Sequence, residues 1–313
     1  METVLEVKEL SISFTQYTGG IGRRSLPVIR DLSLKIGAGE VVAVVGASGS
    51  GKSLLAHGIL DLLPYNSSME GEIFYRGLPL TKNRIRRLRG KEIVLVPQGV
   101  SYLDPLMKVG PQIGKGLRDP GTKARIEEAL ARYGLEQNTK ELYPFELSGG
   151  MARRVLISTA VMETLHLVIA DEPTPGLDEK SAVRILKHFR EIAEEGAGVL
   201  LITHDLEAAL SVADKITVFY AGETIETAPV SDFSSGEKLR HPYTKALWAA
   251  MPSHGFGVAP GAQPYPGELK TGCLYGPRCK KCRKECREAE TIPWLEVRDG
   301  QVRCLYPDEG GGQ

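Results

Sequence analysis

Cysteine is absent before position 273 of this 313-residue chain, and its five cysteines all lie between Cys273 and Cys304. Disulfides scattered through a secreted fold would not leave this distribution, so the cluster requires a local explanation. An excess of one charge is also absent, because 39 Lys and Arg residues balance 39 Asp and Glu residues. We therefore expect no general attraction to nucleic acid or to an anionic membrane surface.

Long apolar runs are missing as well. No segment approaches the roughly 20 apolar residues that a membrane-spanning helix needs. The opening residues, METVLEVKEL, place acidic side chains where a signal peptide would be basic and then apolar. These absences predict a cytoplasmic chain whose role at a membrane depends on partners. Apolar residues nevertheless make up 42% of the chain, which is typical of a globular core.

Short apolar segments alternate with amphipathic ones up to about residue 235, and this pattern predicts an α/β fold. The runs VVAVV and LVIA are apolar throughout, as expected for strands that are buried on both faces of a sheet. The predicted strands are residues 40–45, 92–96, 167–170, 198–203 and 215–220. The predicted helices are residues 52–62, 122–133, 149–162, 180–193 and 206–213.

The composition changes after residue 231. A helix-like segment, HPYTKALWAAM, leads into the Gly- and Pro-rich stretch PSHGFGVAPGAQPYPG and then into the cysteine region. Clusters of Gly and Pro interrupt regular structure. We therefore predict a core domain at residues 1–235 and a small C-terminal extension at residues 236–313 that carries the cysteines.

The strongest local motif is G-A-S-G-S-G-K-S, a full match to the phosphate-binding pattern G-x-x-x-x-G-K-S. It follows an apolar strand and opens a helix, the context in which backbone N–H groups and a helix N-terminus wrap phosphates. The amine of Lys52 is expected to reach the β- and γ-phosphates of ATP, and the hydroxyl of Ser53 to bind Mg²⁺. The predicted ATP-binding residues of this loop are Gly46, Ala47, Ser48, Gly49, Ser50, Gly51, Lys52 and Ser53.

Two carboxylates end a later apolar strand, Leu-Val-Ile-Ala-Asp-Glu. Adjacent carboxylates after a strand are common, but beside a phosphate-binding loop they match the needs of ATP hydrolysis. Asp171 is predicted to hold the Mg²⁺ shell, and Glu172 is predicted to polarise the attacking water.

The segment Leu-Ser-Gly-Gly-Met at positions 147–151 distinguishes among the enzyme classes that share this loop. It resembles the signature turn of the ABC ATPase family, which lies shortly before the Asp-Glu strand. The resemblance implies a P-loop NTPase fold of the ABC cassette type, with a mixed sheet core and a helical signature subdomain at about residues 99–162. It also implies that Ser148, Gly149 and Gly150 open a helix whose N-terminus faces the ATP held by a partner subunit.

Other residues resemble family elements in the expected order. Gln98 follows the strand IVLVP and resembles the Q-loop glutamine that touches Mg²⁺ and relays motion to membrane subunits. Asp178 resembles the D-loop aspartate, although Pro-Gly is an unusual beginning for that loop. His204 resembles the switch histidine that contacts the γ-phosphate and is counted with Glu172 and Gln98 among the catalytic residues. Phe14 is predicted to stack on adenine, with Tyr17 as the alternative.

Several further segments narrow the branch of the family. Met151 in the signature turn, the segment SYLDPLMKVGPQI after the Q-loop, the run HPYTKAL and the later pairs GC and PRC are similar to the oligopeptide, dipeptide and nickel importers. The resemblance implies an ATP-hydrolysing subunit that energises uptake of oligopeptides or dipeptides, with nickel or a metal–chelator complex as the alternative cargo. The implied partners are a second ABC ATPase subunit (a sister chain), two membrane permease subunits and an extracytoplasmic solute-binding protein. The chain would then be peripheral at the cytoplasmic face of the membrane.

The branch pattern also covers four cysteines, Cys273, Cys279, Cys286 and Cys304, and similar members can bind a [4Fe–4S] cluster there. Four thiolates suit such a cluster, and Zn²⁺ is the chemical rival. Cys282 is additional, and Cys279-x-x-Cys282 is itself a ligand-like spacing, so the choice of four ligands stays open. Reduced structural thiols are the alternative without a metal.

A non-transport ABC ATPase that acts on nucleic acid is the distant alternative. The basic run KNRIRRLRGK at residues 82–91 has no interleaved aromatic residues for base stacking, so we interpret it as a solvated turn. The single cassette and the absence of net basic charge likewise predict no nucleic-acid partner.

Overall fold

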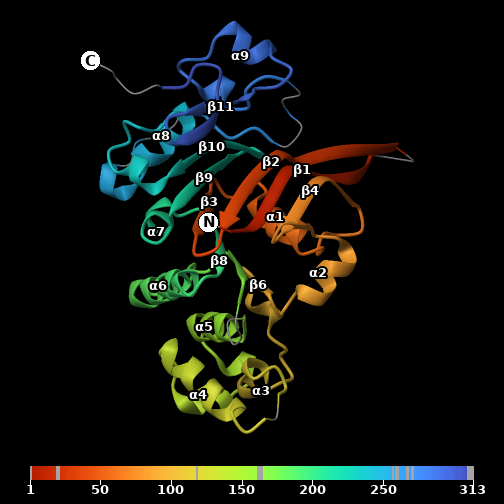
Figure 1. The fold of residues 1–313 in the computed structure, drawn as a ribbon, viewed down its shortest axis with the longest axis vertical. Helices are drawn as coiled ribbons and strands as arrows, with labels where there is room; N and C mark the ends of the chain where they lie inside the picture. The colour runs from red at the N-terminus through yellow and green to blue at the C-terminus, as the bar shows by residue number, and fades with distance from the viewer. Residues whose placement is uncertain are drawn as a thin grey trace.

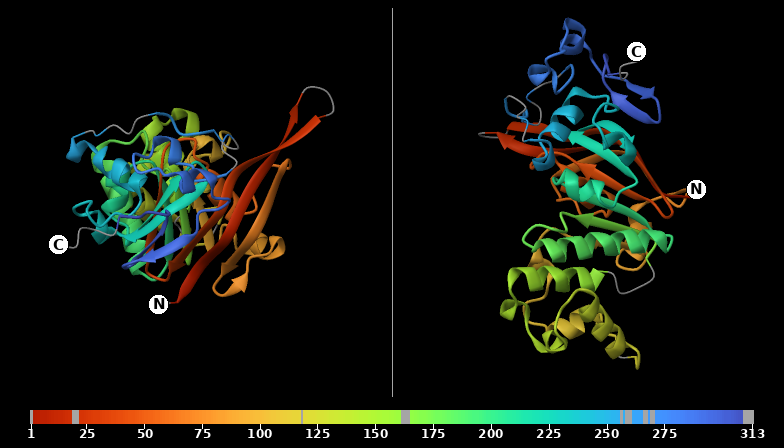
Figure 2. Two further views of the ribbon diagram at one scale, coloured as in Figure 1. Left: turned by 90° about the horizontal axis from the view of Figure 1, so that it is seen from above. Right: turned by 90° about the vertical axis from the view of Figure 1, so that its left-hand side faces the viewer.

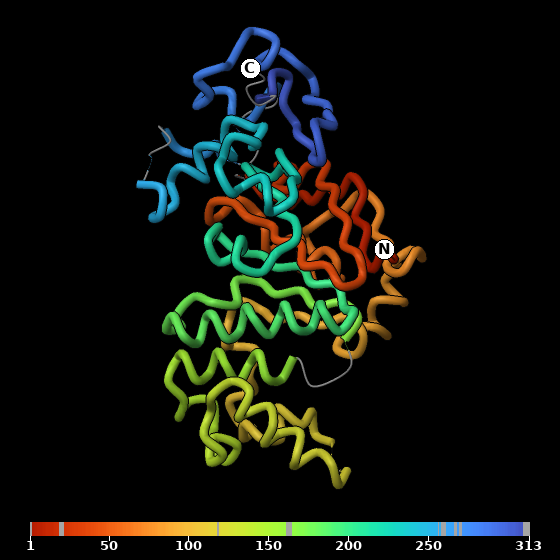
Figure 3. The backbone as a smooth tube through the Cα atoms, turned by 60° about the vertical axis from the view of Figure 1, so that its left-hand side comes forward, coloured from red at the N-terminus to blue at the C-terminus, as the bar shows by residue number. Residues whose placement is uncertain are grey.

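The structure is a computed structural model that describes residues 2–18, 22–117, 119–160, 165–255, 257, 261–265, 268 and 271–308. The molecule has three tiers along its longest axis (Figure 1). A helical region occupies one end, two sheets occupy the middle, and the C-terminal extension occupies the other end. The tube in Figure 3 shows the same order of tiers from another side.

A central sheet holds the middle tier together, with strands in the order β11-β12-β10-β9-β3-β8-β7-β6. The strands are β3 (Val41–Val45), β6 (Ile93–Val96), β7 (Leu167–Asp171), β8 (Gly198–Thr203), β9 (Lys215–Tyr220), β10 (Glu223–Pro229), β11 (Trp294–Val297) and β12 (Gly300–Arg303). Strands β9 to β6 run parallel, whereas β10, β12 and β11 join in antiparallel fashion. The predicted core strands are confirmed, and the mixed sheet agrees with the predicted α/β class.

A second, antiparallel sheet has the order β2-β1-β4-β5. It consists of β1 (Thr3–Thr18), β2 (Gly22–Gly37), β4 (Ser67–Tyr75) and β5 (Leu78–Pro79). None of these strands was predicted. The outer half of β1, with the sequence SFTQYT, is mostly polar, and its last three residues are exposed, so no apolar periodicity marks it as a strand. Figure 2 shows the β1–β2 hairpin extending beyond the body of the molecule.

Helices pack against the central sheet and form the helical tier. They are α1 (Lys52–Ile59), α2 (Lys82–Leu88), α3 (Val109–Ile113), α4 (Thr122–Arg132), α5 (Gly149–Ala160), α6 (Glu179–Glu194), α7 (Leu206–Leu210), α8 (Pro242–Ala249) and α9 (Lys284–Glu288). Within the described part of the chain, no helix combines the length and the apolar character needed to cross a bilayer.

Four predictions on the helices need correction or cannot be followed to their end. The predicted helix at 52–62 ends at Ile59, because Asp61 adopts a left-handed backbone with φ 52°, and the one at 206–213 ends at Leu210. The basic run interpreted as a turn forms helix α2 instead, and the Thr81 hydroxyl caps it by accepting from the Arg84 N–H at 3.3 Å. The end of the predicted helix at 149–162 lies outside the described residues, which stop at Ala160 before resuming at 165.

The core lies on both faces of the central sheet. Along β3, Val41, Ala43 and Val45 point into one hydrophobic cluster, while Val42 and Val44 point into another. The helical tier and α6 contribute apolar side chains to the first cluster. Helix α1 and the antiparallel sheet contribute to the second. The run VVAVV is therefore apolar throughout because the strand has no solvent-facing side.

The C-terminal extension continues the central sheet, because β12 pairs with β10. Arg240, just before α8, is fully buried and forms ion pairs with Glu226 of β10 at 3.3 Å and with Asp232 at 2.8 Å. Its Nε also donates to the Val297 carbonyl of β11 at 2.7 Å. We call this group the buried clasp, since it joins the sheet to the extension. The domain boundary at residue 235 stays a prediction.

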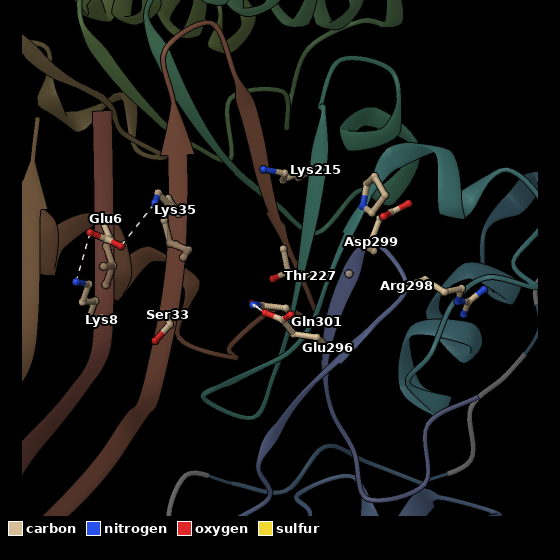
Figure 4. A pocket seen from close by; sticks show the side chains of 15 residues that line it. Glu6, Lys8, Ser33, Lys35, Lys215, Thr227, Glu296, Arg298, Asp299 and Gln301 are labelled. Carbon is tan, nitrogen blue, oxygen red and sulfur yellow. Dashed lines mark hydrogen bonds and ion pairs between the residues drawn. The ribbon is translucent and has the colours of Figure 1, made fainter. Parts of the chain in front are cut away.

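A groove of about 480 Å³ lies at the seam between β1, β2, β10 and the β11–β12 hairpin (Figure 4). Lys8 and Lys35 flank Glu6, with N–O distances of 3.5 and 3.9 Å, and Lys215 pairs with Glu40 at 2.7 Å. The groove is lined by charges of both signs and presents no concentrated charge of one sign: Lys8, Lys35, Lys215 and Arg298 with Glu6, Glu296 and Asp299.

Candidate functional site

Four predicted segments meet at one edge of the central sheet. The phosphate-binding loop follows β3, Gln98 follows β6, Asp171 ends β7, and His204 follows β8. Because these strands are parallel, their carboxyl ends lie at the same edge, where open α/β sheets bind ligands. We refer to this place as the carboxyl edge.

The phosphate-binding loop is shaped by its glycines. Gly46 passes so close to β9 that a Cβ there would lie 2.1 Å from the Phe219 carbonyl oxygen, so a side chain does not fit. Gly51 adopts φ 101°, a left-handed conformation that turns the chain into α1 at Lys52. These two positions explain why the motif requires glycine at its beginning and before its lysine.

The amine of Lys52 is folded back over this loop. The residue is only 5% exposed, and its Nζ donates to the carbonyl oxygens of Gly46 at 2.8 Å and Ala47 at 2.9 Å. Burial lowers the pKa of Lys52, while the nearby carboxylates of Glu172 and Asp171 act in the opposite direction. A buried cation held by exchangeable carbonyl partners is suited to receive phosphate oxygens.

Two of the predicted Mg²⁺ ligands lie side by side. The Ser53 hydroxyl donates to the Asp171 carboxylate at 3.1 Å, which joins the start of α1 to the end of β7. Burial raises the pKa of Asp171, and the Ser53 hydrogen bond opposes that shift. Two adjacent oxygen donors of this kind fit a hard cation such as Mg²⁺. Gln98, the third predicted donor, has an exposed side chain at the end of β6.

Glu172 and His204 face each other across β7 and β8. His204 Nδ1 lies 2.8 Å from Glu172 Oε2, and because a carboxylate only accepts, Nδ1 is the donor. Glu172 is 6% exposed and has φ 48°, held by its N–H bond to the Ile202 carbonyl at 2.8 Å. A non-glycine residue in this strained region is often found at functional sites. The structure therefore brings together a carboxylate and a histidine that are 32 positions apart.

Arg153 is a residue of this site that sequence reasoning missed. It lies on α5, is 4% exposed, and donates to the carbonyl oxygens of Pro97 at 3.0 Å and Pro173 at 3.1 Å. It also donates to the Gln98 carbonyl. One side chain thus ties the helical tier to the segments after β6 and β7. Two adjacent arginines in a helix are typical of a solvated surface. No local signal in the sequence distinguishes the buried Arg153 from Arg154.

The signature turn and the D-loop lie next to each other. A Cβ placed on Gly150 would lie 3.7 Å from the Gly176 carbonyl oxygen. The Ser148 hydroxyl accepts from the Met151 N–H at 3.2 Å at the start of α5, and Ser148 and Gly149 are exposed. Asp178 caps α6 by accepting from the Ser181 N–H at 2.9 Å and hydroxyl at 2.7 Å. The N-terminus of α5 is therefore exposed on this surface.

The predicted adenine-stacking residues differ in exposure. Phe14 is partly buried and packs against the hydrophobic cluster between α1 and the antiparallel sheet. Tyr17 is 67% exposed, and the Arg23 guanidinium lies 5.6 Å from its ring centroid. Phe14 therefore has a role in the core, and the choice between the two rings stays a prediction.

The cysteines line one small cavity in the extension, together with His241 and Tyr275. Burial raises the pKa of Cys273 to about 12 and that of Cys304 to about 11, and it also raises the pKa of Cys279. All five are free of disulfides: Cys273, Cys279, Cys282, Cys286 and Cys304. Within the described residues, no three or more His, Cys, Asp or Glu side chains are drawn together as a metal site.

Comparison with known proteins places this geometry in a family. Residues 29–175 match the family model described as "ABC transporter", and residues 225–286 match "Oligopeptide/dipeptide transporter, C-terminal region". Among solved structures, the ATP-binding cassette MJ0796 in its post-hydrolysis dimer superposes with a TM-score of 0.63 at 26% identity. That match covers 72% of this chain and 98% of the other. The predicted ABC cassette fold is thereby confirmed.

Curated relatives extend the match over the whole chain. The oligopeptide transport ATP-binding protein OppD of Mycobacterium tuberculosis is 37% identical over 97% of this chain, which spans only 52% of that relative's length. The oligopeptide transport ATP-binding protein AppD of Bacillus subtilis is 33% identical, and the match covers 100% of both chains. A full-length relative together with both family models shows that this chain belongs to the ABC transporter ATP-binding proteins, in their oligopeptide and dipeptide branch.

Proposed function

We propose that this chain binds ATP at the carboxyl edge and hydrolyses it to drive an importer of oligopeptides or dipeptides. The observation that carries the proposal is the buried Glu172 carboxylate, held by His204 at 2.8 Å beside the Lys52 amine and the Ser53–Asp171 pair. These groups supply a phosphate cradle, oxygen donors for a cation and a base, which are the parts that phosphoryl transfer to water requires.

Nucleotide binding begins at the phosphate-binding loop. Phosphate oxygens take the place of the Gly46 and Ala47 carbonyls as partners of Lys52 Nζ, assisted by the N-terminus of α1. The Ser53 hydroxyl and the Asp171 carboxylate would hold Mg²⁺, with Gln98 as a third donor. Bound Mg²⁺ supplies positive charge that neutralises the charge developing on the phosphate oxygens.

Hydrolysis depends on Glu172. Its carboxylate accepts a hydrogen bond from the attacking water and takes up the proton as the water oxygen bonds to the γ-phosphorus and ADP leaves. His204 donates to Glu172 from Nδ1 and so holds the carboxylate in place while also approaching the γ-phosphate. The left-handed backbone of Glu172 is a strained conformation of the kind that functional sites retain.

A second cassette completes the site. The exposed signature residues Ser148 and Gly149, with Gly150, would contact the γ-phosphate bound by a partner ATPase, which we expect to be a sister chain. Asp178 lies on the same surface. The MJ0796 structure is a dimer of cassettes bound to ADP and Pi, which supports this arrangement. Closure on ATP and reopening after hydrolysis would provide the mechanical cycle.

The segment after Gln98 offers a surface for the membrane permeases. Val100, Tyr102, Leu106 and Met107 are 41%, 59%, 86% and 42% exposed. A group of exposed apolar side chains marks a surface that another protein covers. Since Arg153 ties this segment to the carboxyl edge, movement at the ATP site would reach the permeases here, with the chain peripheral at the cytoplasmic face.

The cargo is proposed from the relatives. OppD and AppD are named as oligopeptide transport ATP-binding proteins, and the C-terminal family model is described as an oligopeptide/dipeptide transporter C-terminal region. We therefore favour a peptide delivered by an extracytoplasmic solute-binding protein, with nickel or a metal–chelator complex as the alternative that the test must separate.

We also propose that the thiols of the extension hold a metal group. Cys273, Cys279, Cys286 and Cys304 line one cavity, which supports binding of a [4Fe–4S] cluster or Zn²⁺, although their thiols are not drawn into ligand positions in the described residues. Iron, sulfide and zinc analysis of protein purified without oxygen tests this. Less than one equivalent of each, in protein that keeps its ATPase activity, would assign the cysteines to a reduced structural role.

The function is tested by uptake in cells that lack this chain. Radiolabelled tripeptide and ⁶³Ni²⁺ are supplied, and the cells are complemented with the wild type or with Lys52→Ala. We expect tripeptide uptake to fall without the chain, to return with the wild type and to stay low with Lys52→Ala, while nickel uptake is unchanged. Loss of nickel uptake alone would replace the peptide assignment, and no change in either would reject both cargoes.

A further inference from the structure

Arg303 of β12 ties the C-terminal extension to strand β2 of the antiparallel sheet. The residue is 6% exposed, and its Nη2 donates to the Asp31 carboxylate at 2.6 Å and to the Asp31 carbonyl at 3.0 Å. Its Nη1 lies 3.9 Å from the Glu223 carboxylate at the start of β10, and its Cζ lies 5.0 Å from the ring centroid of Trp294. The guanidinium is thus held by carboxylates of two different strands and by an aromatic ring.

Asp31 lies at a β-bulge in β2. Leu10 of β1 is opposite Leu32, whereas Ile12 is opposite Ile29, so β2 holds one more residue than β1 over this stretch. Asp31 itself adopts a left-handed backbone with φ 45°. A bulge bends the strand that contains it. The contacts that hold Asp31 therefore also set the direction of the outer part of the β1–β2 hairpin (Figure 2).

The residues of β2 just before this bulge pack against the phosphate-binding loop. The Arg30 N–H donates to the Gly222 carbonyl in the β9–β10 turn at 2.8 Å, and a Cβ on Gly222 would lie only 2.3 Å from the Val28 carbonyl oxygen. A Cβ on Gly51 would lie 3.3 Å from Cγ1 of Val28 and 3.4 Å from its carbonyl oxygen. Val28 thus lies against both the β9–β10 turn and the loop residue that precedes Lys52.

We propose that Arg303, supplied by the C-terminal extension, is a positioning residue for the nucleotide site. It fixes the bulge at Asp31 and so keeps Val28 in place against Gly51. It also sets the direction of the outer hairpin, which carries both candidates for stacking on adenine. The affinity for ATP then depends on an extension that contributes no residue to the phosphate-binding loop. The inference rests on the proposed binding of ATP at this loop.

Arg303→Lys tests the inference because it keeps the buried positive charge but removes the planar guanidinium. An ammonium group cannot reproduce the paired contacts to Asp31 and the approach to Glu223. We expect the Kd for MgATP to rise about three- to tenfold, the effect of losing one net hydrogen bond. The KM for ATP should rise by a similar factor while kcat at saturating ATP stays within about twofold. A purely structural loss would instead lower the active fraction, and so reduce the apparent kcat at an unchanged Kd.

Asp31→Asn approaches the same contact from the other side. Asn tolerates a left-handed backbone, and the Asp31 side chain is 51% exposed, so this variant should keep the fold. Its Kd for MgATP should rise by a similar factor. The double variant with Arg303→Lys should bind about as weakly as the weaker single variant, because both changes remove one interaction. Fully additive losses would show that the two residues act independently and would overturn the inference.

Amide hydrogen exchange gives a readout that does not depend on nucleotide. Exchange of residues 22–32 should become faster in Arg303→Lys and in Asp31→Asn, because the bulge loses its support. Unchanged exchange of this segment in both variants would overturn the inference even if the affinity fell.

Arg298→Lys is the matched control. Arg298 lies in the same β11–β12 hairpin, but its Nη2 donates to the Lys238 carbonyl at 2.7 Å and to the Asp308 carbonyl at 3.4 Å. This variant also exchanges a guanidinium that binds backbone carbonyls, and its Kd for MgATP should match that of the wild type. A wild-type Kd in Arg303→Lys, or an equal rise in Arg298→Lys, would overturn the inference.

Lys52→Ala separates this inference from the proposed function. If the wild type binds MgATP, Lys52→Ala does not, and Arg303→Lys binds normally, the proposed function stands and the role of Arg303 is rejected. If Lys52→Ala binds MgATP as the wild type does, the proposed nucleotide site itself is rejected.

Discussion

The carboxyl edge and the buried clasp both bury charged side chains, but they satisfy them in different ways. At the edge, the Lys52 amine bonds to two backbone carbonyls and Glu172 bonds to a half-exposed histidine. In the clasp, Arg240 and Glu226 are fully buried and paired with each other. The Arg240 and His241 backbone N–H groups also donate to Glu226, at 2.9 and 2.8 Å.

The difference separates a binding site from a structural joint. A charge whose partners are carbonyls or an exposed side chain can exchange them for a ligand at little cost. A charge that is closed in by buried partners of opposite sign cannot, and removing one partner leaves an uncompensated ion. Substitutions at the edge should therefore reduce activity more than stability, and substitutions in the clasp should do the reverse.

Glu172→Gln should give the largest effect, a loss of ATP turnover. A loss of stability instead would contradict the distinction between the carboxyl edge and the buried clasp. The amide keeps the shape but cannot accept the proton of the attacking water, so kcat should fall about 10²- to 10⁴-fold. Binding of MgATP and the melting temperature should change little. Steady-state ATP turnover and nucleotide titration measure both quantities, and turnover near that of the wild type would remove Glu172 from its assigned role.

Arg240→Ala tests the clasp. Glu226 would be left buried without its cation, which costs about 3–5 kcal/mol of unfolding free energy. Urea denaturation provides the measurement. Lys108→Ala serves as the control, because the exposed Lys108–Glu141 pair at 3.2 Å should contribute no more than about 1 kcal/mol. Equal losses in the two variants would contradict the distinction between joint and surface.

Arg153→Lys examines a residue of the carboxyl edge that shares one feature with the clasp. Its partners are backbone carbonyls, but it is buried and joins two tiers of the molecule. A lysine head cannot reach carbonyls on both sides as the planar guanidinium does. We expect kcat to fall about tenfold with a nearly unchanged KM, since the segments of Gln98 and Glu172 lose their common support. Arg154→Lys, whose donor bonds lead to the Gly150, Tyr133 and Gly134 carbonyls and not to the segments after β6 and β7, should keep the wild-type rate.

The smallest expected effect is a dependence of stability on pH that comes from His188, which lies between α6 and the helical tier. Arg132 Nη1 lies 2.6 Å from its Nε2, so that nitrogen accepts and Nδ1–H donates to the Tyr133 hydroxyl. Burial, with help from Arg132, lowers the pKa of His188 from 6.5 to about 4. The unfolded chain therefore binds more protons than the folded one between these values, and stability falls as the pH drops through this range.

The measurement is the melting temperature between about pH 7 and pH 5. His188→Gln, which cannot take up a proton, should show a shallower decline than the wild type. Some slope should remain, because burial also lowers the pKa of His241 to about 3. Parallel curves for the two proteins would show that His188 does not contribute.

Prediction from the sequence worked where the signal was local. The strand VVAVV and the loop that follows it are contiguous, so the backbone shape at Gly46 and Gly51 and the placement of Lys52 follow from short-range order. The sequence did not reveal β1 and β2, because their polar outer halves are held by pairing with each other rather than by apolar burial. It also missed Arg153, whose carbonyl partners lie 20 and 56 positions away.

The residue types and their order by themselves determined the α/β class, the phosphate-binding loop and the position of the two carboxylates, because each depends on a strand and the turn next to it. Only the tertiary structure decided which charges are buried and which groups meet. It paired Glu172 with His204, paired Glu226 with Arg240, and packed Tyr243 of the extension against Tyr220 of β9. Such contacts join distant positions through packing of the whole chain, and their energies depend on burial that no local pattern specifies.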